Sequence, residues 1–382
     1  MAGSRTLAIG VMSASTSGQL TQITLPFMVG ALITGLNLNE QQAGLLCSAE
    51  LITVALVSFA VAPLMGAWPR RTVAIIGAAI AILAHGFSAT LVDLPSIVAA
   101  RMVAGFGAGL MLAAGNASIA NSPNPDRLSS LLLISVGLAQ LVSLSLLPLI
   151  IPKWQHSGIF AYQAMLIALL VPLVMLLPQR RADSTDPAGT RPVPAKLPIG
   201  PTLAIVTAIA LFSARETALW AFTEQIGLRS GLTKAQIGVI LGATGVLALS
   251  GAGAAAIIGT RFSRMKPLMI GLVFNAVLAF WISQTSNATV FAIVEVVYHA
   301  FLFFTAPYLF GLAAELDPSG RIVASAGGAL LFGGSLGPVI GGYLIAIAGF
   351  AAIGAFILAS VAVVMLLAWQ LQRRLDRQSA TV

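Results

Sequence analysis

Residues 350–370 read FAAIGAFILASVAVVMLLAWQ, an apolar run that contains no charged residue. A helix needs about 20 apolar residues to cross the hydrocarbon core of a bilayer, and this run is long enough. Arg373, Arg374 and Arg377 follow it directly. An apolar run that ends in several basic residues is typical of a transmembrane helix with its flank on the cytoplasmic side.

The same pattern recurs along the whole chain. Of the 382 residues, 58% are hydrophobic and only 8% are charged, whereas a soluble domain carries roughly 25% charged residues. The composition therefore excludes a water-soluble fold and indicates an all-α integral membrane protein. The predicted transmembrane helices, twelve in number, are 7–35, 43–67, 72–92, 95–117, 128–151, 158–177, 201–226, 234–258, 267–284, 288–312, 322–347 and 350–370.

The basic residues outside these spans predict the orientation. If both termini are cytoplasmic, fifteen Lys and Arg lie on the inside and three, Lys153, Arg229 and Lys234, lie on the outside. Because cytoplasmic loops are enriched in basic residues, we expect both termini in the cytoplasm and a multi-pass protein of the bacterial inner (plasma) membrane. The net charge of +8 follows from this bias, so no nucleic-acid partner is expected. The first apolar stretch lacks a cleavage pattern and is interpreted as the first helix, not a signal peptide.

The two halves of the chain share a pattern at one fixed offset. Residues 38–44 (LNEQQAG) and 232–238 (LTKAQIG) both have Leu first, Gln fifth and Gly last, and 232 − 38 = 194. At that offset Arg70 also matches Arg264, and Gly77 matches Gly271. Asn39 and Thr233 are suited to cap the helices that follow them. A six-helix unit used twice is therefore predicted, with boundaries at 1–178 and 201–382 and a cytoplasmic linker at 179–200.

Several functional classes find no support in the residues. The single Cys47 excludes a disulfide framework or a CxxC motif, and three scattered histidines, His85, His156 and His299, do not indicate a metal site. We therefore expect no metal and no cofactor. An intramembrane enzyme would need a nucleophile or metal constellation, and a sensor or an ATP-driven pump would need a soluble domain for which the loops are too short.

The repeat and several short motifs of the chain resemble those of the major facilitator superfamily. Residues 66–71 (GAWPRR) and 259–264 (GTRFSR) are similar to the glycine- and arginine-bearing loops of that family, without their usual acidic residue. Arg101, followed by Gly105, is similar to its helix-4 motif, and Gly337-Pro338 lies in the eleventh span. The resemblance implies two pseudo-symmetric six-helix bundles around a cavity lined by helices 1, 4, 7 and 10. It also implies gating loops, which carry Arg70, Arg71, Arg261 and Arg264.

Six ionisable residues fall well inside the predicted spans. A charge at the centre of a transmembrane helix costs about 2.5–3.5 kcal/mol on insertion scales, so such residues are candidates for function. Counting from the predicted helix ends places five of the charges in one layer, and the repeat puts Arg101 opposite Glu295 because 101 + 194 = 295. The six residues are Glu50, Arg101, Arg215, Glu216, Glu295 and His299.

We expect these residues to form one polar cluster across the two halves. Three glutamates face two arginines, so one acid lacks a permanent partner and is suited to carry a proton. The hypothesis assigns proton coupling to Glu295, Glu216, Glu50 and His299. Structural ion pairing is the alternative interpretation. Glu224 and Arg229 are expected at the membrane interface, and His85 is expected to pack at the periphery.

The sequence predicts a secondary transporter for a small organic solute. Its cavity is expected to be lined by Arg101, Arg215, Gln22, Gln19, Trp220 and Tyr298. Seven aromatic residues on the tenth span favour an amphipathic or aromatic solute. Proton coupling and alternating access are the leading hypothesis, with an uncoupled facilitator or a sugar or drug efflux permease as alternatives, and a non-transporting sensor less favoured. The expected partners are the solute, protons and the lipid bilayer, with the protein as a monomer.

Overall fold

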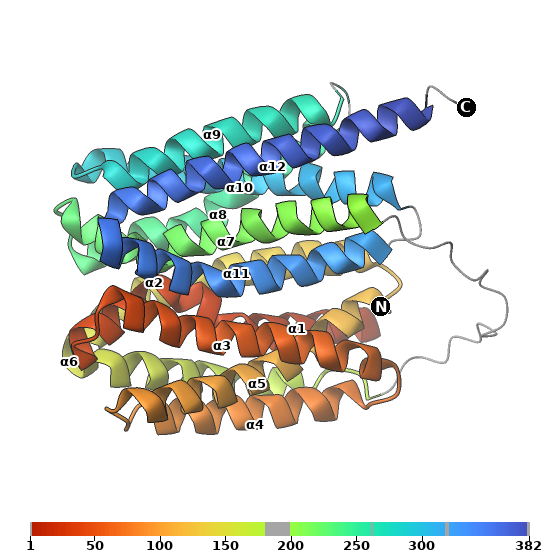
Figure 1. Ribbon diagram of the computed structural model, residues 1–382. Helices are drawn as coiled ribbons and strands as arrows, with labels where there is room; N and C mark the ends of the chain where they lie inside the picture. Colours follow the sequence, from red (N-terminus) through yellow and green to blue (C-terminus); the bar gives the residue numbers. More distant parts are fainter. Residues whose placement is uncertain (1, 180–198, 260, 262, 318–320, 380–382) are drawn as a thin grey trace.

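The computed structural model describes residues 2–179, 199–259, 261, 263–317 and 321–379, and every regular element in these ranges is helical. The predicted all-α fold is confirmed. The helices run lengthwise through one bundle (Figure 1). Their bounds are α1 Ala2–Gly18, α2 Leu20–Leu36, α3 Glu40–Val61, η1 Ala62–Gly66, α4 Arg70–Ser88, α5 Leu94–Ala120, α6 Pro125–Val174, α7 Ile199–Arg229, α8 Lys234–Ile258, α9 Met265–Gln284, α10 Ala288–Leu316, α11 Arg321–Ala348 and α12 Phe350–Ser379.

Eleven segments of the described chain are long and apolar enough to cross a membrane. The first, Arg5–Leu36, joins α1 and α2 across a local distortion at Gln19, where φ is −102° and ψ is 3°. The prediction of twelve spans differs because it divides α6 in two. The number of membrane crossings therefore depends on the path of α6.

Helix α6 contains a sharp break. It has 50 residues, and at Gln155 the backbone leaves the helical region (φ 49°, ψ −132°). Tyr162 Oη donates a hydrogen bond to Ser143 Oγ at 2.9 Å, although a straight helix would separate residues 19 positions apart by about 28 Å. The two arms of α6 therefore lie against each other, and Gln155 lies between the predicted spans 128–151 and 158–177.

The capping residues predicted from the repeat are confirmed. Asn39 accepts a hydrogen bond from the backbone N–H of Gln42, whose side chain accepts one from the N–H of Asn39. Thr233 and Gln236 form the same reciprocal capping box at the start of α8. Each box satisfies two amides at a helix start that would otherwise lack partners. The shared pattern of 38–44 and 232–238 therefore has a shared local structure.

The two halves of the chain meet through three helix pairs: α3 with α11, the first arm of α6 with α8, and α2 with α7. We call the end of the bundle where α1 begins and α12 ends the terminal face, on the right of Figure 1, and the other end the distal face. Small residues allow transmembrane helices to approach closely. A Cβ atom at Gly44 would meet the backbone of Pro338, and one at Gly342 would meet the backbone of Glu40. These glycines therefore permit tight closure of α3 on α11 in the distal half.

Candidate functional site

A cavity of about 520 Å³ lies between the two halves. Its walls come from α2, the first arm of α6, α7, α8, α10 and α11. On α8, α10 and α11 the lining residues Ala252, Phe310 and Leu330 belong to the half of each helix nearer the terminal face. The cavity therefore extends from the middle of the bundle toward that face.

The lining combines aromatic rings with polar groups. Gln19, Gln22 and Gln140 lie on the N-terminal half of the chain, and Glu216 and His299 lie on the C-terminal half. Among the described lining residues, Glu216 is the only Asp, Glu, Lys or Arg. The aromatic lining residues are Phe212, Trp220, Phe303 and Phe310.

Trp220 joins the two halves at the cavity wall. Its Nε1 donates a hydrogen bond to the carbonyl oxygen of Gln22 at 2.9 Å. Its ring meets that of His299 edge-on, with centroids 5.3 Å apart. Of the seven aromatic residues noted on the tenth span, Phe303 and Phe310 line this cavity. Tyr298, which was predicted to line it, does not.

A group that we call the C-terminal acid cluster begins at the cavity wall with Glu216 and His299 and continues behind it with Glu295 and Tyr298. Tyr298 Oη donates a hydrogen bond to Glu216. His299 Nε2 lies 4.0 Å from Glu216 Oε1, and His299 Nδ1 lies 3.4 Å from Glu295 Oε1. Glu295 is fully buried, and neither of its carboxylate oxygens has a hydrogen-bond partner in the described chain. His299 therefore lies between an acid that lines the cavity and an acid sealed from it.

The hydrogen bond of His299 indicates which of its ring nitrogens carries the proton. Nδ1 lies 3.0 Å from the backbone carbonyl oxygen of Glu295, and a carbonyl can only accept, so Nδ1 carries a proton. In the neutral ring, Nε2 then has a lone pair directed to the side where Glu216 lies. A proton shared between His299 Nε2 and the Glu216 carboxylate would give each of these two groups a hydrogen-bond partner.

A second polar group, the N-terminal ion-pair cluster, lies within the N-terminal half. Arg101 Nη1 is 3.4 Å from Glu50 Oε2, and both side chains are fully buried. Thr21 donates a hydrogen bond to Glu50 Oε1 at 2.7 Å. Arg101 also donates to Ser88 Oγ at 2.6 Å and to His85 Nδ1 at 2.9 Å. Because a guanidinium only donates, His85 Nδ1 must accept.

The single cluster expected from the sequence is therefore two clusters. Glu50 and Arg101 pair inside the N-terminal half, and Glu216, Glu295 and His299 meet inside the C-terminal half. Neither Arg101 nor Arg215 lines the cavity. Arg215 is fully buried and donates a hydrogen bond to Asn275 Oδ1 at 2.8 Å. Its other two guanidinium nitrogens have no hydrogen-bond partner in the described chain. Equal depth along the helices did not distinguish the two groups, because depth does not show which way each helix face points.

Two other ionisable residues have partners that the sequence did not indicate. His85 was expected to pack at the periphery, yet it is a direct partner of Arg101. Glu224, which was expected at the membrane interface, lies near the distal end of α7, where it is fully buried and 3.3 Å from Lys234 Nζ. Its carboxylate also lies against Gly30 of α2. Gln140 of α6 joins the two halves by donating a hydrogen bond to Leu241 O at 2.9 Å.

The arginines of the predicted gating loops lie at the terminal face. Arg70 Nε donates to Met65 O at 3.3 Å, and Arg71 Nε donates to Leu177 O at 2.6 Å. Arg264 pairs with Glu315 of α10 at 2.9 Å, so an acid outside the loop supplies its partner. Arg261 is exposed.

The fold and the cavity define a polytopic membrane protein with a solute-sized space between its two halves. The family model described as Major Facilitator Superfamily matches residues 7–322. The chain belongs to this superfamily, as its loop and helix motifs predicted, and this membership indicates a transporter and not an enzyme. No curated protein sequence matches the chain.

Solved structures of transporters share the fold. A mutant form of the nucleoside transporter NupG is similar with a TM-score of 0.74 and 14% identity, covering 96% of this chain and 99% of that chain. A bacterial homologue of the human lysosomal transporter Spinster, inward-facing and unoccupied, has a TM-score of 0.73, 12% identity and coverage of 96% and 97%. A D-xylose-proton symporter has a TM-score of 0.70, 17% identity and coverage of 94% and 95%. Identities this low show the fold alone.

Proposed function

We propose that this chain is a secondary active transporter that couples proton movement to the movement of a small organic solute by alternating access. The observation that carries the proposal is the cavity between the halves, lined by Glu216 and His299 with the buried Glu295 behind them. A buried acid without a hydrogen-bond partner is costly unless it takes up a proton. Proton uptake and release at such a group is a means of coupling.

The proton path that we propose runs from the cavity through His299 to Glu295. Glu216 takes a proton from water in the cavity and passes it to Nε2 of His299, and Nδ1 of His299 then releases its own proton to the carboxylate of Glu295. Tyr298 positions Glu216 by its hydrogen bond. Glu50, which the sequence suggested for this path, is sealed in the N-terminal ion-pair cluster. We therefore assign it a structural role.

Alternating access is supported by the closed distal half. Ser48 Oγ accepts a hydrogen bond from the backbone N–H of Val339 at 2.9 Å across α3 and α11. Gly30 of α2 packs against Glu224 of α7. The cavity lies between these contacts and the terminal face. If the two arms of α6 cross the membrane separately, the protein has twelve spans and both termini lie in the cytoplasm of a bacterial cell. The cavity then opens to the cytoplasm, which is an inward-facing conformation. The protein acts as a monomer.

The lining favours a neutral or cationic solute with an aromatic or apolar body. Glu216 supplies a negative charge, and the arginines once expected in the cavity are buried elsewhere. A cation over the face of an aromatic ring such as that of Trp220 gains an interaction energy of about 0.5–2 kcal/mol. An organic anion would find no lysine or arginine among the described lining residues. Gln19, Gln22 and Gln140 can hydrogen-bond a neutral polar group, so a sugar permease is the second candidate.

Binding can be tested before the solute is known. Trp220 is 6% exposed, whereas the other four tryptophans are at least 41% exposed. A variant with Trp68, Trp154, Trp281 and Trp369 replaced by Phe would leave Trp220 as the only indole. Aromatic amines, neutral glycosides and aromatic acids of matched size are then screened by fluorescence. Amines should change the emission and acids should not, and a Trp220→Phe variant provides the control.

Each ligand found in this way is then offered to proteoliposomes under an imposed pH gradient. Gradient-driven accumulation supports the coupled transporter, and its sign distinguishes symport from antiport. Saturable movement that ignores the gradient would establish the facilitator instead. If no solute moves while Trp220 reports binding, the transport proposal fails.

A further inference from the structure

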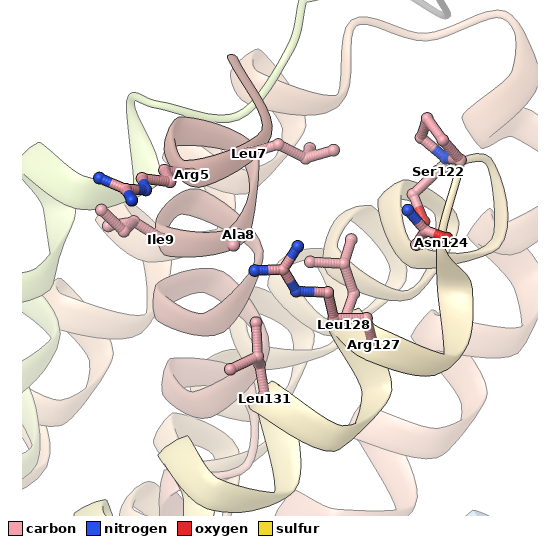
Figure 2. Close-up of a pocket in the computed structure, with 10 residues that line it drawn as sticks. Arg5, Leu7, Ala8, Ile9, Ser122, Asn124, Arg127, Leu128 and Leu131 are labelled. Carbon is pink, nitrogen blue, oxygen red and sulfur yellow. The ribbon is translucent and has the colours of Figure 1, made fainter. Parts of the chain in front are cut away.

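A second pocket, of about 470 Å³, opens at the terminal face, away from the central cavity. The start of α1, the connection between α5 and α6, and the first two turns of α6 form its walls. Figure 2 shows Arg127 extending from α6 across the pocket toward α1, with Ser122 and Asn124 on the other side. Arg5 lies on the first turns of α1.

The polar part of this pocket is basic. Arg5 and Arg127 both line it, and no aspartate or glutamate does so among the described lining residues. Asp126 neighbours Arg127 in sequence but does not line the pocket. Ser122 Oγ is buried without a hydrogen-bond partner in the described chain, and the side chain of Asn124 does not cap α6. The pocket therefore presents two cations and two unused polar groups.

These two arginines differ from others at the same face. Arg71 donates to a backbone carbonyl and Arg264 pairs with Glu315, so protein groups already engage them. In the described chain Arg5 and Arg127 have neither an ion pair nor a hydrogen bond to their side chains. A general excess of basic residues in cytoplasmic loops accounts for their charge. It does not account for both of them lining one concave pocket.

The apolar part of the pocket lies deeper. Leu128 and Leu131 follow Arg127 along α6, about 2–6 Å further into the bundle at about 1.5 Å per residue. Leu7 and Ile9 contribute the matching wall from α1. Arg5 begins a candidate membrane span, which places the basic groups near the membrane surface and the leucines up to about one turn deeper. A free phosphate ion would make no use of these apolar walls.

We propose that this pocket binds the phosphodiester headgroup of an anionic phospholipid from the leaflet at the terminal face. Arg5 and Arg127 hold the phosphate, Ser122 and Asn124 offer hydrogen bonds to the headgroup, and Leu128 and Leu131 contact the upper acyl chains. Basic pockets between transmembrane helices are suited to such headgroups. An occupying lipid would link the start of α1 to the start of α6.

The test measures lipid binding to the purified full-length chain by native mass spectrometry. Short-chain phosphatidylglycerol is titrated against phosphatidylcholine and against inorganic phosphate. The Arg5→Gln/Arg127→Gln variant should bind phosphatidylglycerol about thirtyfold more weakly, because each basic residue near an anionic surface contributes about 1 kcal/mol. Arg373→Gln/Arg374→Gln removes the same charge from the end of α12 and should leave binding within about twofold of the unmodified protein.

Two further variants address folding and the ligand source. Arg5→Lys/Arg127→Lys retains the charge and should restore most of the binding. Leu131→Gln should weaken phosphatidylglycerol binding and leave phosphate binding unchanged. Equal affinity for phosphatidylcholine, an equal loss in the control at α12, or full competition by inorganic phosphate would each overturn the proposal.

Discussion

The N-terminal ion-pair cluster allows a sharp test of what holds the first half of the protein together. Glu50→Gln keeps the shape of the side chain but leaves Arg101 buried without its counter-charge. Breaking one member of a buried pair costs about 3–5 kcal/mol. A change of 1 kcal/mol shifts Tm by about 2–4 °C in soluble domains of about 150–250 residues. We therefore expect Tm to fall by about 6–20 °C.

The chain carries its own reporter for this measurement. Cys47, the single cysteine, is fully buried three residues before Glu50 on α3. A dye that fluoresces on reacting with thiols therefore detects unfolding of this part of the bundle. Glu40→Gln makes the same chemical change at the first residue of α3, where no ion pair forms in the described chain, and should shift stability by no more than about 0.5 kcal/mol.

A double-mutant cycle separates the pair from its surroundings. Arg101→Gln also removes the hydrogen bonds to Ser88 and His85, so this single variant should be less stable than Glu50→Gln. The double variant should lose about 0.5–3 kcal/mol less than the sum of the two single losses, which is the range for residues in contact. Strictly additive losses would refute the claim that the two charges stabilise each other.

Three other predictions concern the closed distal half, the repeat and the cavity. Gly44→Ala adds a Cβ that meets the backbone carbonyl of Pro338, so α3 and α11 should separate at the distal face. Spin labels next to the distal ends of these two helices should show longer distances, and unchanged distances contradict the contact. Asn39→Ala and Thr233→Ala should each cost about 1 kcal/mol in thermal unfolding, since both cap a helix in the same way; a loss at only one of them would argue against equivalent caps. Glu216→Gln should weaken the binding of an aromatic amine at least tenfold and that of its neutral analogue less than twofold, measured by Trp220 fluorescence, and equal losses would show that the charge does not select the solute.

The sequence was a reliable guide to the elements because each signal was local. Apolar runs set the helices, and the capping boxes at Asn39 and Thr233 follow from residues three positions apart. Gly337, part of the Gly-Pro pair noted in the eleventh span, packs against Thr217 of α7. Helix α6 breaks at Gln155, between the two predicted spans.

The site was harder to predict because its contacts depend on the rotation of each helix about its axis. Arg101 and Glu295 are equivalent positions of the repeat, yet Arg101 turns to α3 and α4 while Glu295 meets His299 one turn along its own helix. The role of His85 could have been suspected, since a histidine on an apolar face needs a buried partner. Nothing in the sequence identified Arg101 as that partner.

The measurement that tests the central claim most directly uses Glu295→Gln in proteoliposomes with the solute found by fluorescence. Exchange of labelled for unlabelled solute at equal concentrations requires movement of the halves but no net proton transfer. For the unmodified protein, one proton per solute gives about tenfold accumulation for each unit of pH gradient, since one pH unit corresponds to about 1.4 kcal/mol. The account predicts that Glu295→Gln retains exchange and accumulates no solute. Accumulation by Glu295→Gln equal to that of the unmodified protein would contradict it.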